Sequence, residues 1–162
     1  GLAKVVDAIV LLRGSDAWAS KYEAEMQNWM TQYLEWLRFS DHGKKESIHP
    51  NNHGTYYDLQ VVSLALFTNQ PGIAHEILEK SKSRRFDAHI AEDGEQPHET
   101  ARTKGYDYST MNLKGLFQLA VMGEKLGFDL WNYKNTTEYC IRCFEAVSRR
   151  MTVSITPAAS TT

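Results

Sequence analysis

Hydrophobic residues recur every three or four positions along most of the chain, which is the spacing of one helix face and not of a strand. Residues 2–12 predict a first helix that ends at Gly14, and a second helix follows it. Large side chains on this second helix advance by threes and fours, at Tyr22, Met26, Trp29, Tyr33, Trp36 and Leu37. We expect this stripe to face the core, because burying such side chains contributes about 1.5–3 kcal/mol each.

Apolar and polar segments alternate through the middle of the chain. Residues 40–50 are polar, contain Gly43 and end in Pro50, a pattern that predicts an irregular loop. Residues 55–68 are apolar on almost all sides, which predicts a helix buried among others. Residues 71–82 predict a shorter helix that begins at a proline.

The following segments predict a strand, a long loop and two more helices. Residues 86–90 have the composition of a strand, although no partner strand is evident. Residues 91–108 are polar and contain little that could be buried, so they predict a loop of a length that is uncommon unless functional. Helices are expected at residues 110–127 and 136–150, and residues 151–162 predict a disordered tail. The two polar loops are therefore the places to look for chemistry.

Length and charge exclude several classes of protein. The chain of 162 residues predicts a single helical domain over residues 1–150, followed by the tail. Its 18 basic residues nearly balance its 20 acidic ones, and the net charge of −2 argues against a nucleic-acid binder. No apolar run approaches the ~18 residues that cross a bilayer, so we expect a soluble protein without a membrane partner.

The first polar loop ends in three residues that could contact an anion. Asn51, Asn52 and His53 stand where the buried helix begins, and their donors would add to the positive end of the helix dipole. Spacing alone favours a simpler interpretation, in which the asparagines cap the helix and the histidine bonds a backbone carbonyl.

The second polar loop contains a candidate acid or base. Arg102 and Tyr108 are six residues apart with Gly105 between them, so a chain reversal could bring the guanidinium close to the phenol. A positive neighbour lowers the pKa of a tyrosine from its usual value near 10 and makes it a better base. The alternative is a solvated loop in which Glu99 and Arg102 form an ion pair worth a few tenths of a kcal/mol.

Metal chemistry is disfavoured. His49 and His53 are four residues apart, as helical zinc ligands are, but Pro50 and Gly54 argue against an ordinary helix there. Cys140 and Cys143 have a spacing that suits neither a disulfide framework nor a zinc site with four ligands. We expect no metal and no other cofactor.

Residues 51–60 closely resemble the signature of the alginate lyase superfamily, especially its branch that cleaves glucuronan and alginate. The second loop resembles the catalytic loop of the same family at Gln96, Pro97, residues 99–102, Tyr106, Tyr108, Ser109 and residues 111–113. Two separated motifs in the family's order make the resemblance specific. It extends from about Leu11 to Tyr133.

The resemblance implies an all-α fold, part of an (α/α) toroid built from antiparallel helical hairpins. It also implies metal-independent β-elimination on a polyuronic acid, β-1,4-glucuronan or alginate, in an extracellular or periplasmic location. Asn52, His53 and Arg102 would neutralise the carboxylate of the sugar that loses its C5 proton. Tyr108 would transfer that proton, with His53 as the base where the C5 configuration presents it on the opposite face. Further substrate contacts are implied at Asn51, Tyr57, Gln96, Glu99, Tyr106 and Trp18.

The number of helices raises a second possibility for function. A complete toroid needs roughly 200–300 residues, so we expect only part of one here. Exposed apolar helix faces in a partial domain would favour self-association. The alternative to a lyase is a helical domain that binds uronans, or a remnant of a lyase, without turnover.

Overall fold

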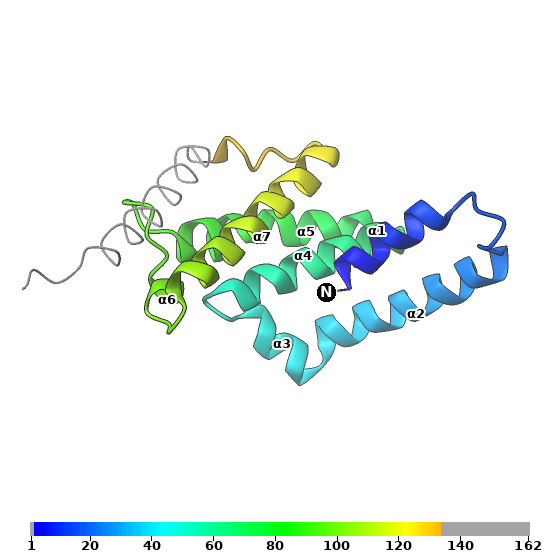
Figure 1. The fold of residues 1–162 in the computed structure, drawn as a ribbon, viewed down its shortest axis with the longest axis horizontal. Coiled ribbons are helices and arrows are strands. Elements are labelled where there is room, and N and C mark those ends of the chain that lie inside the picture. The colour runs from blue at the N-terminus through cyan, green and yellow to red at the C-terminus, as the bar shows by residue number, and fades with distance from the viewer. Residues whose placement is uncertain (1, 134–162) are drawn as a thin grey trace, which may run out of the picture.

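The computed structural model describes residues 2–133, and this part of the chain consists of helices with no strand (Figure 1). Five longer α-helices form the body, namely α1 (Ala3–Leu12), α2 (Ser20–Phe39), α4 (Asn52–Phe67), α5 (Pro71–Ser81) and α7 (Gly105–Lys125). Three short segments connect them, namely α3 (Asp41–Ser47), the π-helix η1 (Lys82–Asp87) and α6 (Pro97–Thr100). The all-α prediction is confirmed. The helix predicted at residues 136–150, both cysteines and the tail lie outside the described residues.

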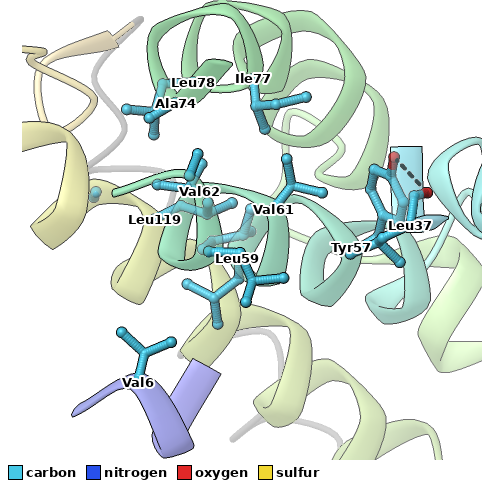
Figure 2. Close-up of a cluster of buried hydrophobic side chains, with 14 of the residues drawn as sticks. Val6, Leu37, Tyr57, Leu59, Val61, Val62, Ala74, Ile77, Leu78 and Leu119 are labelled. Atoms are coloured by element: carbon cyan, nitrogen blue, oxygen red, sulfur yellow. Dashed lines mark hydrogen bonds between the residues drawn. The ribbon is translucent and has the colours of Figure 1, made fainter. Parts of the chain in front are cut away.

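Helix α4 is the centre of the fold because its sequence is apolar on every side. It packs against α1, α2, α5 and α7, and most of its side chains are buried. Figure 2 shows Val61 and Val62 of α4 beneath Ile77 and Leu78 of α5. Each such side chain contributes about 1.5–3 kcal/mol when it leaves water, so this helix holds the others together.

Successive long helices run antiparallel, and α7 runs alongside α4 in the same direction (Figure 1). The turn between α4 and α5 is tight, since Asn69 has a left-handed φ of 56° and Pro71 opens the next helix. The amino ends of α4 and α7 therefore lie at one end of the bundle, and the turn between α1 and α2 lies at the other (Figure 1). Both polar motifs are brought to the same end by this topology.

The prediction that the large side chains of α2 face the core is wrong in part: Leu37 is buried and Met26 and Tyr33 pack against the core, but Tyr22 and the two tryptophans do not. Met30, Leu34 and Leu37 form the buried face of this helix, while Trp29 and Trp36 are 47% and 49% exposed. Tyr33 stacks between the two tryptophans, with ring centroids 5.4 and 5.7 Å away. Met30 and Leu34 stand one position after Trp29 and Tyr33, so a second set of apolar residues at helical spacing supplies most of the buried face.

The prediction of an irregular loop over residues 40–50 is wrong in part, because Asp41–Ser47 form helix α3 and residues 48–50 are irregular. The Ser40 side chain caps this helix by accepting a hydrogen bond from the Gly43 N–H at 3.0 Å. A Cβ at Gly43 would stand 1.8 Å from the carbonyl oxygen of Leu37, so glycine is required for the close approach of α3 to α2. The glycine that suggested a loop is there for packing.

Residues 86–90 are not a strand, because the η1 turn and the helical residues after it occupy that position. Arg85 and Phe86 are buried in this turn, and Arg85 forms an ion pair with Asp58 of α4. The prediction for residues 91–108 is also wrong in part. That segment contains α6 and the start of α7, and it buries Gln96 and Glu99.

Two further expectations concern the surface. No helix within residues 2–133 is long and apolar enough to cross a bilayer. Apolar side chains are exposed on α1, at Val5, Val10, Leu11 and Leu12. Self-association through this face stays a prediction.

Candidate functional site

A buried carboxylate joins the two polar motifs. Glu99, which is 1% exposed, accepts hydrogen bonds from both the backbone N–H and the side-chain amide of Asn52. The Asn52 Nδ2 lies 3.0 and 2.8 Å from the two carboxylate oxygens. Arg102 forms an ion pair with the same carboxylate, at 3.1 Å from Nη1 to Oε2. Asn52 and Arg102 are thus held in fixed positions by one charge near the amino end of α4, where the helix dipole favours it.

Arg102 also lies against Tyr108. Its guanidinium carbon is 3.3 Å from the centroid of the Tyr108 ring, a cation–π contact. Tyr108 is half-buried in the first turn of α7. The predicted proximity of Arg102 and Tyr108 is confirmed, and so is the ion pair between Glu99 and Arg102, although Glu99 is buried and not in the solvated loop that the alternative supposed. Together with the hydrogen bonds between Asn52 and Glu99, these two contacts form a single series from Asn52 through Glu99 and Arg102 to Tyr108.

His53 is adjacent to this series and has a different partner. Its Nδ1 lies 2.6 Å from Oε1 of Glu46 in α3, and its ring centroid is 5.2 Å from that of His49. Asn51 caps α4, since its side-chain oxygen accepts the His53 N–H at 3.1 Å. The capping interpretation is therefore confirmed for Asn51, whereas the His53 ring is bonded to a carboxylate and not to a backbone carbonyl.

A groove runs from His53 between α1, α4 and α7, and we call it the α4/α7 groove. It comprises two adjoining hollows of about 480 and 300 Å³, which share His53, Glu46, Tyr56, Lys4, Lys114 and Gln118. Neither Lys4 nor Lys114 forms an ion pair with any residue among 2–133. Asn52 lines the smaller hollow. Arg102 and Tyr108 do not line either hollow, and they connect to the groove through Glu99 and Asn52.

The connection between α3 and α4 is held by a buried ion pair. Arg85 donates from Nε to Asp58 at 2.8 Å and from Nη2 to the carbonyl of Ser47 at 2.6 Å. A Cβ at Gly54 would stand 2.3 Å from the carbonyl oxygen of His49 and 2.6 Å from Arg85 Nη1. Glycine is thus required at position 54, because the first turn of α4 packs directly against the His49 backbone and the Arg85 side chain.

Comparison with known proteins identifies the family. A family model described as alginate lyase matches residues 1–142. The chain belongs to the alginate lyase family. The crystal structure of an alginate lyase from Bacteroides ovatus is similar, with a TM-score of 0.79 and 33% sequence identity over 81% of this chain. The match covers 34% of that enzyme, so the chain spans about a third of its length. No curated protein matches the chain.

The family resemblance implied substrate contacts at Glu99, Gln96 and Tyr57, and all three side chains are buried; the Glu99 carboxylate is taken up by Asn52 and Arg102. Gln96 is 2% exposed and bridges Ser109 and Asn112, donating to the carbonyl of the first at 3.1 Å and accepting from the amide of the second at 2.8 Å. Tyr57 is also buried, and its hydroxyl donates to the carbonyl of Leu37 at 3.3 Å (Figure 2). Burial raises the pKa of the Tyr57 phenol. The side chains of Gln96 and Tyr57 hold the scaffold of the site.

The remaining predicted contacts fall into separate regions. Trp18 lies in the connection between α1 and α2, at the opposite end of the bundle from both motifs, and donates to Glu23 at 2.9 Å. It does not belong to this site. Tyr106 is exposed in the first turn of α7, two residues before Tyr108, and Asn51 is occupied as a cap. Within residues 2–133 no group of three or more histidine, cysteine or acidic side chains could hold a metal ion.

Sequence reasoning missed three residues of the site. Glu46 is seven positions before His53, and Lys4 and Lys114 belong to helices at the two ends of the described chain. No local pattern marks them, because they meet only when α1, α3 and α7 pack around α4. Arg85 was missed for the same reason, since it stands in a polar and charged segment, residues 80–87, where nothing in the sequence marks it as buried.

Proposed function

We propose that this chain carries the catalytic loops of a polysaccharide lyase that cleaves a polyuronic acid, β-1,4-glucuronan or alginate, by β-elimination. The observation that carries the proposal is the series of contacts from Asn52 through Glu99 and Arg102 to Tyr108. Beside it lies a groove whose two lysines, Lys4 and Lys114, have no ion-pair partner among residues 2–133. Membership of the alginate lyase family supports it.

The reaction removes the proton at C5 of a uronate, forms a C4=C5 double bond and expels the oxygen on C4. A proton beside a carboxylate is weakly acidic, so the negative charge that develops on the carboxylate must be stabilised by donors already in place. Arg102 suits this role, since it uses one nitrogen for Glu99 and keeps further donors of its planar fork for a ligand. The Asn52 amide already donates to Glu99, so it would share its N–H groups between that carboxylate and the sugar.

Two side chains are candidates for the proton transfer. Tyr108 would accept the C5 proton and return it to the departing O4 oxygen, which requires no second group. His53 would act as the base where the C5 proton lies on the opposite face of the sugar ring. Both side chains are near donors that would hold the carboxylate, so the C5 configuration of the substrate decides between them.

The α4/α7 groove would bind the polymer beyond the reacting sugar. A polyuronate carries a carboxylate on each sugar, and Lys4 and Lys114 place positive charge along the groove that starts at His53. The apolar face of Tyr56 and the amides of Gln60 and Gln118 line the same groove and suit the hydroxyls and ring faces of sugars.

A panel of polysaccharides tests this proposal. The chain is mixed separately with glucuronan, alginate and an uncharged β-1,4-glucan, and the ultraviolet absorbance of the unsaturated uronate product is followed. We expect product from a uronan and none from the uncharged polymer. Uronan binding without any product, weakened by Arg102→Ala, would instead favour a binding domain without turnover. If the chain shows no uronan binding and forms no product, both the lyase and the binding-domain interpretation are overturned.

A further inference from the structure

The contact between Glu46 and His53 has a consequence for the chemistry of the histidine. The Nδ1 atom lies 2.6 Å from Oε1, a short contact, and charge-assisted hydrogen bonds are shorter than neutral ones. An ionised carboxylate has no proton to donate, so the proton between the two atoms belongs to Nδ1. We propose that Glu46 is a positioning residue that holds His53 in the tautomer protonated at Nδ1, which leaves Nε2 as the atom that meets the substrate. This inference rests on the proposed function.

The other ring nitrogen is available. Among residues 2–133, Nε2 of His53 has no hydrogen-bond partner, and the ring lines both hollows of the α4/α7 groove. In the neutral ring this nitrogen carries a lone pair, so it can accept a proton or a hydrogen bond from a sugar. The tautomer thus decides whether His53 can act as a base toward the groove.

Glu46 is placed firmly enough to fix the ring. Helix α3, which carries it, is capped by Ser40 and packed against α2 through Gly43. The carbonyl of Ser47, one residue after Glu46, accepts a hydrogen bond from buried Arg85 at 2.6 Å. A carboxylate at this position would not attract a polyuronate, so its contribution is to the orientation and the protonation of the histidine.

The tautomer is measured directly by NMR of the ring nitrogens in the ¹⁵N-labelled full chain, at a pH where the ring is neutral. The His53 signals are identified by their loss in His53→Gln. We expect the wild type to be protonated at Nδ1 and Glu46→Ala to shift toward the form protonated at Nε2. Glu46→Gln keeps an acceptor oxygen and should retain the wild-type form. Glu35→Ala, which removes an exposed acid of α2, is the matched control and should change nothing.

Turnover of the uronan that serves as substrate gives the second readout. On a uronan whose C5 configuration makes His53 the base, Glu46→Ala should lower kcat at least about tenfold with a smaller change in KM, and Glu46→Gln should restore most of the rate. A wild-type His53 protonated at Nε2, or a tautomer that is the same in Glu46→Ala, would overturn the inference. If the tautomer shifts as expected and no variant or wild type cleaves any uronan, the positioning contact stands and the proposed function fails.

Discussion

Glu99 accepts hydrogen bonds from Asn52 and so joins the first turn of α4 to the short helix α6, 47 residues further along the chain. The carboxylate is buried and its remaining partner is Arg102, so one negative charge sets the positions of an amide and a guanidinium. Donors that are oriented before the substrate arrives need no reorganisation during the reaction.

Replacing Glu99 tests that arrangement. Glu99→Gln keeps the shape of the side chain but puts an N–H where one of its accepting oxygens stood, opposite donors of Asn52 or Arg102. We expect the free energy of unfolding to fall by about 1–3 kcal/mol, since a buried donor loses its partner. Urea denaturation measures the change. Glu25→Gln, at an exposed position of α2, should alter it by less than about 0.5 kcal/mol.

The contribution of Lys114 to binding in the α4/α7 groove is tested through the affinity for the uronan. Lys114→Gln removes a positive charge that has no acidic partner among the described residues, so the uronan should bind less tightly and KM should rise several-fold. The difference from the wild type should shrink at high salt because charge attraction is screened. Lys21→Gln on α2 removes an exposed lysine far from the groove and serves as the control. Equal KM values for the wild type and Lys114→Gln at low salt would show that the groove does not bind the polymer.

The buried pair of Asp58 and Arg85 should behave differently from an exposed one. Arg85→Met removes the buried partner of Asp58 and leaves only the partly exposed Arg84 against its charge, so we expect a loss of about 3–5 kcal/mol in the free energy of unfolding. The double variant with Asp58→Leu should recover a large part of that loss, because no buried charge remains. Arg13→Met breaks the exposed pair with Glu23 and should cost less than about 1 kcal/mol. Chemical denaturation compares the three.

His89 predicts how stability depends on pH. Burial lowers the pKa of this imidazole from 6.5 to about 3 in the folded protein. The unfolded chain therefore binds a proton between these values that the folded chain does not, and the free energy of unfolding falls as the pH falls through that window. The slope approaches about 1.4 kcal/mol per pH unit. Denaturation between pH 6.5 and 4.5, before the carboxylates protonate, should show a shallower slope for His89→Gln than for the wild type.

The helices of this fold were predictable from periodicity, because α4 and α5 follow local patterns of apolar residues and turn residues. The face of α2 was not predictable in the same way. Two stripes of large apolar residues share that helix, and only the surface of α4 selects Met30 and Leu34 over Trp29 and Trp36. Helix α3 was missed because Gly43, a loop former by propensity, is required there by contact with Leu37.

The site was predictable to the extent that short motifs carry it. The proximity of Arg102 to Tyr108 followed from a glycine between them, and the cap at Asn51 followed from its place before an apolar helix. The partner of His53 did not follow, because it is brought close by the packing of α3. Gln96 stands in a recognisable motif, yet its burial between Ser109 and Asn112 is a tertiary property that the motif does not contain.

The most direct test of the central claim is the initial rate of unsaturated uronate formation by the wild type and by Tyr108→Phe, on a uronan that the wild type cleaves. Tyr22→Phe, an exposed tyrosine on α2, is the matched control. The account predicts that Tyr108→Phe lowers kcat by about 10²–10⁴-fold and that the control keeps the wild-type rate. A rate for Tyr108→Phe equal to that of the wild type would contradict it.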